Sequence, residues 1–135
     1  MMRRRGLPAG RPDEGTAPIV GVGIDTEPWD ALGRFAAQDV DAFAGRRLTA
    51  AERAWCAGQP APVRSVVACV CGKEAVWKAT AGRTGTGAIE VAGPQGLRSG
   101  VVAGGLEVAL AWRFGARVVL VTAIACERDR VRGLV

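Results

Sequence analysis

The residues that could do chemistry in this chain are carboxylates and lysines, because its 135 residues include no histidine and no tyrosine. An imidazole base, a Ser-His-Asp triad and a histidine-bound zinc ion are therefore excluded. Two acidic positions break the pattern of their surroundings, and such breaks often coincide with function. Asp25 ends an apolar segment, and Glu27 follows two residues later, on the same side of an extended chain. Glu74 falls on the apolar side of a predicted helix.

Both lysines of the chain lie beside Glu74: Lys73 precedes it and Lys78 follows one helical turn later. Proteins usually hold Mg²⁺ by one or two carboxylates, with water and substrate phosphate as the other ligands. A lysine ammonium is a good point charge for phosphate. The residues are thus compatible with a magnesium-dependent phosphate chemistry, with Asp25 and Glu74 at the ion and Lys78 at the phosphate. The alternative is structural: Glu74 and Lys78 form a surface pair at spacing i,i+4, and Asp25 is a turn residue.

A strand and a helix are needed to bring these residues together, and the sequence predicts both. Residues 18–25 are typical of a strand, and apolar spacing with a closing Gly82 predicts a long helix over 63–81. The other expected elements are helices over 29–43 (opened by Pro28) and 50–57 (capping box Thr49 to Glu52), strands over 88–92, 105–112 and 117–126, and a hairpin turn at 113–116. This order predicts an α+β fold with helices packed on a mostly antiparallel sheet.

The last strand is apolar on both faces, since residues 118, 120 and 124 face one way and residues 119, 121 and 123 the other. A sheet with one wet face would alternate apolar and polar residues. We therefore expect one face to meet the helices and the other to meet a second subunit.

The composition bounds the remaining possibilities. With 49% hydrophobic and 23% charged residues, the chain suits one packed domain, expected at 18–126. We expect a disordered basic tail at 1–17 and a C-terminal tail at 127–135, which together hold most of the net charge of +5, so a nucleic-acid partner is disfavoured. Neither a signal peptide nor a membrane span is predicted, and the four cysteines are expected to be small buried hydrophobes in a cytoplasmic protein.

Three segments occur in a suggestive order: Gly23-Ile24-Asp25, then 48–53 (Leu-Thr-Ala-Ala-Glu-Arg), then 73–79 (Lys-Glu-Ala-Val-Trp-Lys-Ala), followed by a Gly-Thr-Gly loop. In this order and spacing they resemble the 4′-phosphopantetheinyl transferases. Size and element order are most similar to the small holo-acyl-carrier-protein synthase type, over about residues 18–126. The resemblance implies transfer of phosphopantetheine from coenzyme A to a serine of an apo acyl or peptidyl carrier protein, with release of 3′,5′-ADP.

The resemblance also implies a role for each matching residue. Asp25, Glu74 and Lys78 would be the catalytic set, with Asp25 and Glu74 binding Mg²⁺ at the coenzyme A diphosphate. Glu27 matches an acidic position of the larger branch of the family and is a candidate third ligand. Lys78 would contact the phosphates, and Lys73 would also bind coenzyme A.

Further contacts follow from the same resemblance. The loop residues Gly85, Thr86 and Gly87 would bind coenzyme A. The small branch forms homotrimers and docks its acidic carrier protein on a basic first helix, where this chain offers Arg34, Arg46 and Arg47.

The chain departs from the family pattern in three places, one of which is the stretch 97–105, too short for the helix that usually lies there. A Ser-Leu-Ser-His segment of the penultimate strand is replaced by Ala109-Leu110-Ala111-Trp112, and Gly72 stands directly before Lys73. These departures leave an alternative open: a degenerate or repurposed relative that binds a carrier protein or a pantetheine-tethered intermediate without transfer.

Overall fold

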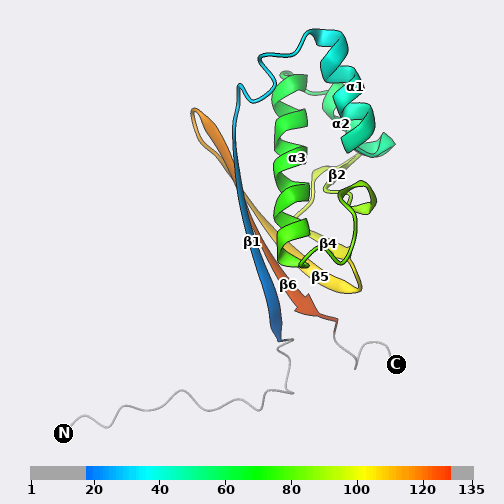
Figure 1. The fold of residues 1–135 in the computed structure, drawn as a ribbon, viewed down its shortest axis with the longest axis vertical. Helices are drawn as coiled ribbons and strands as arrows, with labels where there is room; N and C mark the ends of the chain where they lie inside the picture. Colours follow the sequence, from blue (N-terminus) through cyan, green and yellow to red (C-terminus); the bar gives the residue numbers. More distant parts are fainter. Residues whose placement is uncertain (1–17, 129–135) are drawn as a thin grey trace, which may run out of the picture.

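The computed structural model describes residues 18–128 (Figure 1). The tails predicted at 1–17 and 127–135 lie outside this part of the chain, apart from Glu127 and Arg128. The elements are β1 (Ile19–Pro28), α1 (Ala37–Arg47), α2 (Ala50–Ala57), α3 (Pro62–Ala79), the short 3-10 helix η1 (Thr86–Ala88), β2 (Ala92–Gly93), β3 (Gly96–Leu97), β4 (Gly100–Ala103), β5 (Leu106–Phe114) and β6 (Val118–Glu127).

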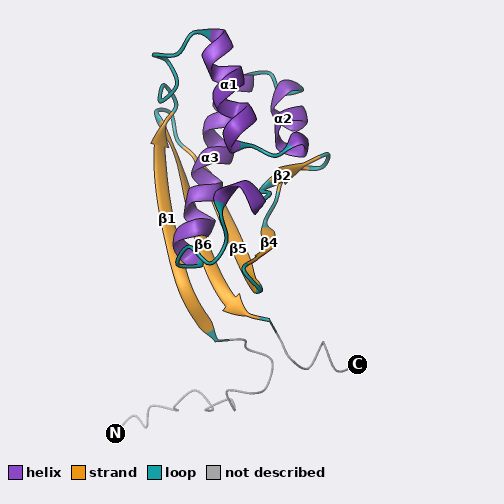
Figure 2. Ribbon diagram, turned by 45° about the vertical axis from the view of Figure 1, so that its right-hand side comes forward, coloured by secondary structure: helices purple, strands orange, loops and turns teal. Residues whose placement is uncertain are grey.

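Four strands form one antiparallel sheet in the order β1-β6-β5-β4, and β2 pairs with β3 in a small separate hairpin. The first long strand therefore lies beside the last, with Asp25 opposite Val121. Figure 2 shows the three helices on one face of the sheet, with α3 lying along it. The predicted α+β architecture of helices packed on an antiparallel sheet is confirmed.

The contact between α3 and β1 is close because β1 carries glycine where it meets the helix. A Cβ atom at Gly23 would lie 2.0 Å from the carbonyl oxygen of Ala75, and one at Gly21 would lie 1.9 Å from that of Ala79. Only glycine permits such an approach of two backbones. The helix is therefore held directly against the strand, two residues before Asp25.

Alternate residues of β6 pack beside this contact and form part of the hydrophobic core. Val119, Val121, Ala123 and Ala125 are fully buried against the helices. Three cysteines (Cys56, Cys69 and Cys71) are buried free thiols, as predicted, whereas Cys126 is partly exposed.

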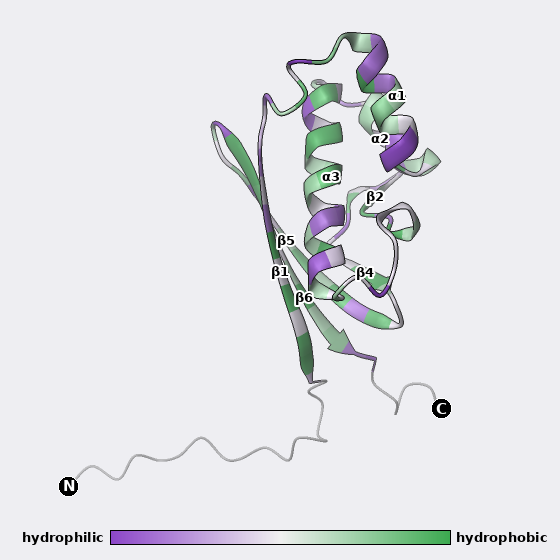
Figure 3. Cartoon of the chain, viewed as in Figure 1, coloured by the Kyte–Doolittle hydropathy of each residue, from purple (hydrophilic) through white to green (hydrophobic). Residues whose placement is uncertain are grey.

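The other face of the sheet is bare and largely apolar, apart from the exposed Glu107 and Arg113 of β5. On β1, Val22 and Ile24 are 55% and 56% exposed, and Val102 of β4 is also exposed. Leu120 and Ile124 of β6 lie between them and are half-buried. Figure 3 shows hydrophobic residues along these strands. The predicted division of β6 into two apolar faces is confirmed. Within residues 18–128, no helix combines the length and the hydrophobicity that crossing a bilayer requires.

The predicted helix over 29–43 is wrong at its start. Residues 29–36 form turns, and α1 begins only at Ala37. Trp29 is held by the β5–β6 hairpin instead: its backbone N–H donates to Arg117 and its indole N–H donates to the carbonyl of Gly115. Pro28 consequently ends β1 rather than opening a helix.

Smaller differences occur in the second half of the chain. The strand predicted over 88–92 is replaced by η1 and the two-residue β2, and β5 extends through Phe114 into the predicted turn. The strand β4, which pairs with β5, was not predicted.

Candidate active site

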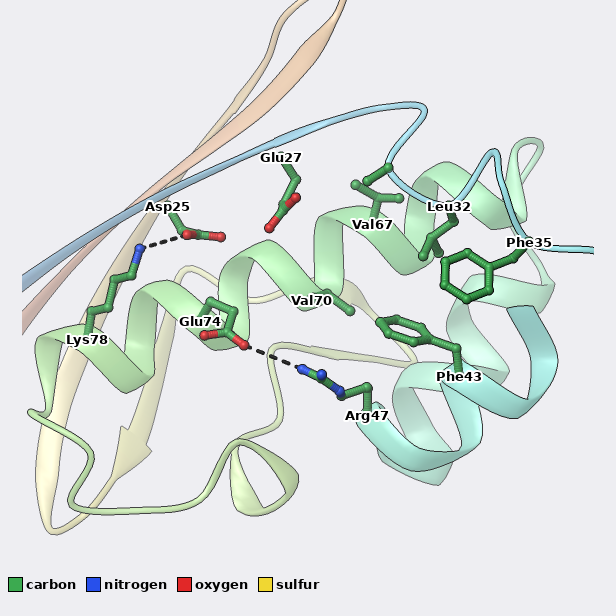
Figure 4. A pocket seen from close by; sticks show the side chains of 11 residues that line it. Asp25, Glu27, Leu32, Phe35, Phe43, Arg47, Val67, Val70, Glu74 and Lys78 are labelled. Carbon is green, nitrogen blue, oxygen red and sulfur yellow. Dashed lines mark hydrogen bonds and ion pairs between the residues drawn. The ribbon is translucent and has the colours of Figure 1, made fainter. Parts of the chain in front are cut away.

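The strand β1 and the helix α3 together supply the acidic residues singled out in the sequence. Asp25 and Glu27 lie on the face of β1 that Gly23 turns towards α3, because side chains alternate along a strand. Glu74 and Lys78 lie one turn apart on α3. Figure 4 shows Asp25, Glu27 and Glu74 around one shared space, with Lys78 at its edge.

Asp25 and Lys78 form an ion pair across the two elements. The ammonium Nζ lies 2.8 Å from Asp25 Oδ1 and also donates to the carbonyl of Ile24 at 3.2 Å. The hydrogen bond to Asp25 raises the pKa of Lys78. The other carboxylate oxygen, Asp25 Oδ2, is buried and has no hydrogen-bond partner. A buried carboxylate oxygen without a donor is costly, so this atom is suited to bind a cation.

Glu74 and Glu27 add negative charge beside Asp25. Arg47 of α1 lies near Glu74, with Nη1 3.6 Å from Oε1. Burial first, and then the charges of Asp25 and Glu74, raise the pKa of Glu27. The three carboxylates thus repel one another, and a bound cation would relieve this repulsion.

These contacts overturn the structural alternative for Glu74. Lys78 pairs with Asp25 and not with Glu74, although the two helix residues have the i,i+4 spacing. Asp25 lies within β1 and is not a turn residue.

A cavity of about 380 Å³ joins this charged cluster to an apolar end. The charged end contains Asp25, Glu27, Arg47, Glu74 and Lys78. The apolar end is formed by Ala31, Leu32, Phe35, Phe43, Val67 and Val70. Sequence reasoning missed this apolar end, and it also missed Arg47 as part of the cavity. The i,i+4 spacing of Phe43 and Arg47 on α1 was the available signal.

The donor set fits a hard divalent ion. All three acidic side chains offer oxygen, which Mg²⁺ prefers, and Asp25 Oδ2 has no competing partner. Among residues 18–128, no three acidic, cysteine or histidine side chains gather closely enough to hold an ion by themselves. This agrees with magnesium sites in which water and substrate phosphate complete the coordination.

The structure gives Lys73 a place different from the predicted one. The Lys73 side chain is 2% exposed and its ammonium lies 2.6 Å from Glu52 Oε1, and Glu52 is itself fully buried. Glu52 also accepts hydrogen bonds from the backbone N–H groups of Thr49 and Val91. Lys73 therefore joins α3 to α2 in the core, contrary to the expected contact with coenzyme A. The predicted capping box is confirmed, but nothing in its spacing indicated that Glu52 would also bind Lys73.

The remaining predicted residues lie outside the cavity. Gly85 precedes η1, which contains Thr86 and Gly87 and lies beside α1 and α3. Arg34 and Arg46 are exposed, on the turn before α1 and in its last turn.

Two of the departures from the family pattern, at Gly72 and at Trp112, are in contact with each other. Trp112 of β5 packs on Gly72 of α3, so that a Cβ atom at Gly72 would lie 2.3 Å from Cη2 of the indole ring. The Trp112 indole N–H donates to the carbonyl of Arg98 at 2.8 Å. Its ring also stacks on Phe114, which stacks in turn on Trp29. Trp112 does not line the cavity of the three carboxylates.

A family model described as the 4′-phosphopantetheinyl transferase superfamily matches residues 21–122, which include Asp25, Glu74 and Lys78. The chain belongs to this superfamily. The resemblance seen in the sequence is thereby confirmed, and with it the assignment to a family of transferases.

Two solved structures similar to this phosphopantetheinyl transferase family member have the same fold. One is a holo-(acyl-carrier-protein) synthase from Bacillus anthracis in complex with coenzyme A (3′,5′-ADP). It has a TM-score of 0.66 and 22% identity, over 81% of this chain and 97% of that one. The other is a holo-[acyl-carrier-protein] synthase from Neisseria meningitidis, with a TM-score of 0.65 and 23% identity, over 80% of this chain and 98% of that one. No curated protein matches the chain.

Proposed function

We propose that this protein transfers 4′-phosphopantetheine from coenzyme A to a serine of an apo acyl or peptidyl carrier protein, in a reaction that requires Mg²⁺. One domain over 18–126 would carry the activity. The observation that supports the proposal most is the meeting of Asp25, Glu74 and Lys78 at one cavity, with Asp25 Oδ2 buried and unpartnered. Family membership and the common fold agree with it.

Phosphoryl transfer asks a protein mainly for positioning and neutralisation of charge, and no histidine is required. The serine hydroxyl of the carrier attacks the phosphorus that bears pantetheine. The bond from that phosphorus to the bridging oxygen breaks, and 3′,5′-ADP leaves with the bond electrons. Lys78 places a positive charge beside the diphosphate, and a carboxylate of the cavity takes up the serine proton.

In this proposal Asp25 and Glu74 hold the magnesium ion, with Glu27 as a third carboxylate. When bound, the ion neutralises charge on the diphosphate. Gly85, Thr86 and Gly87 remain proposed contacts for coenzyme A, since their loop lies beside α1 and α3.

The carrier protein is proposed to dock on the first helix. Arg46 is exposed in the last turn of α1 and Arg34 on the turn before it, and both suit an acidic partner. Reversing their charge should raise the KM for the carrier and leave the affinity for coenzyme A unchanged. A cytoplasmic location is part of the proposal and agrees with the free thiols.

We also propose a homotrimer, because the bare face of the sheet is apolar on β1, β6 and β4, although β5 between them carries Glu107 and Arg113. Large exposed apolar patches on a soluble protein mark interaction surfaces. A monomer in light scattering at micromolar concentration would contradict this assembly.

The deciding experiment incubates the protein with coenzyme A, Mg²⁺ and a panel of apo carriers, and reads the carriers by intact mass. One carrier should gain one phosphopantetheine, only when the divalent ion is present. Glu74→Gln should abolish the gain, whereas Asp41→Asn, which removes an exposed acidic group from α1, should preserve it.

The alternative of a repurposed relative rests on the replaced strand segment at Trp112. It predicts ion-dependent binding of coenzyme A with no mass gain on any carrier. Because Trp112 packs on Gly72 and does not enter the cavity, the structure favours the active transferase.

A further inference from the structure

Arg47 is the one cation of the described cavity that comes from outside β1 and α3. It is the last residue of α1, and its guanidinium lies over the ring of Phe43, 5.3 Å from the ring centroid. This contact directs the side chain into the cavity while leaving it 49% exposed. An arginine held on an aromatic ring in this way is pre-organised for a planar, two-pronged contact with an oxyanion.

The contact of Arg47 with Glu74 is weaker than that of Lys78 with Asp25. Its N–O distance of 3.6 Å is too long for a hydrogen bond. Lys78, by contrast, makes two hydrogen bonds, of 2.8 Å and 3.2 Å, and one of them is to backbone. Partly exposed ion pairs without hydrogen bonds contribute little free energy. Arg47 is thus the cation that can leave its carboxylate at low cost.

The charges of the cavity indicate which group the Arg47 guanidinium would contact once it has left Glu74. Three carboxylates and two cations leave one net negative charge. A divalent ion alone would make the cavity positive by one, and a diphosphate alone would make it more negative. Binding both together keeps the net charge nearly unchanged. A cation displaced from Glu74 by the ion would then face a newly bound phosphate.

We propose that Arg47 is a phosphate-binding residue for the coenzyme A diphosphate, resting on Glu74 until a divalent ion takes that carboxylate. The inference deepens the proposed function and rests on it. It also replaces the role that the sequence suggested for Arg47, that of docking the carrier protein.

The test measures binding by calorimetry, using Mn²⁺ as the ion, for the wild type and for Arg47→Gln. Removing the competing cation should tighten binding of Mn²⁺ alone by about 2- to 5-fold. Loss of a charge-assisted contact should weaken binding of coenzyme A with Mn²⁺ by about 10- to 100-fold. The affinities of Arg47→Lys should fall between those of the wild type and of Arg47→Gln, because lysine keeps the positive charge and lacks the two-pronged guanidinium.

Two arginine variants provide the controls. Arg53→Gln, on the exposed face of α2, should change neither affinity. Arg46→Gln, one residue from Arg47, should raise only the KM for the carrier. Thermal melts of each variant establish that it is folded.

The possible outcomes separate the inference from the proposed function. If the wild type transfers phosphopantetheine but Arg47→Gln binds coenzyme A normally, the inference fails and the function stands. A change in the carrier KM alone would return Arg47 to a docking role. If the wild type binds coenzyme A through Arg47 but modifies no carrier, the inference stands and the function fails. A wild type that does not bind coenzyme A overturns both.

Discussion

Lys73 and Lys78 stand in one short motif, yet the structure predicts opposite consequences of replacing them. Lys73→Met would remove the partner of Glu52 inside the core, where both side chains are almost fully buried. Breaking a buried pair from one side leaves an uncompensated charge and typically costs about 3–5 kcal/mol. For a domain of this size, that corresponds to a fall in Tm of about 12–20 °C.

Lys78→Met is the matched comparison, because the Lys78 side chain is 46% exposed, although that of its partner Asp25 is only 12% exposed. We expect it to leave the mostly buried Asp25 carboxylate without its donor, to cost about 1–3 kcal/mol in stability, less than Lys73→Met, and to remove ion-dependent binding of coenzyme A. Lys73→Met, measured well below its own Tm, should bind coenzyme A like the wild type.

Thermal melts and calorimetry of both variants test this division. Glu52→Gln combined with Lys73→Met should be less destabilised than the sum of the two single variants, because the stranded charge is gone. A Tm of Lys73→Met within about 3 °C of the wild type would refute the reasoning. So would loss of coenzyme A binding in the folded variant.

Three further predictions concern the strand β1. Gly23→Ala should lower the free energy of unfolding by roughly 3 kcal/mol or more, because its Cβ would lie 2.0 Å from a carbonyl oxygen of α3. Gly87→Ala, whose Cβ would have no atom within 4 Å, should leave the stability unchanged, and denaturant titrations measure both variants. The pKa of Glu27 is raised in the folded protein, so the folded state holds the proton of Glu27 more tightly than the unfolded state does. The folding stability that depends on this proton is fully present below the ordinary pKa of 4.5 and is lost as the pH rises through the raised pKa. Glu27→Gln should therefore melt above the wild type at neutral pH without metal, and the difference should vanish below pH 4.5. Ile24→Glu, on the bare face of the sheet, should give a folded monomer in light scattering, and a persistent trimer would place the interface elsewhere.

Local signals predicted most of the fold. The capping box at Thr49 fixed the start of α2, and the apolar spacing located α3 to within two residues at each end. The start of α1 could not be predicted, because Trp29 is fixed by the β5–β6 hairpin, which is distant in sequence. The short β4 has no pattern of its own and exists through pairing with β5.

In the candidate site, too, the sequence indicated some residues but not the contacts that they make. Asp25, Glu74 and Lys78 carried a signal because each interrupts an apolar segment or belongs to a recognisable motif. The partners of these residues could not be foreseen. Whether Glu74 meets Lys78 or Arg47 depends on the packing of α1 against α3, and the burial of Lys73 depends on the position of Glu52.

The contact between Gly72 and Trp112 has a consequence for any attempt to re-engineer the chain. Trp112 must be replaced before Gly72, since a larger residue at 72 is blocked while the indole ring remains. Replacing Trp112 by a smaller side chain is permitted first, but it opens a void beside α3, and voids in a core lower stability in proportion to their volume. Grafting a Ser-Leu-Ser-His segment onto β5 should therefore succeed only as a paired exchange with Gly72→Ala, and a graft of the strand alone would misreport a packing defect as a failure of chemistry.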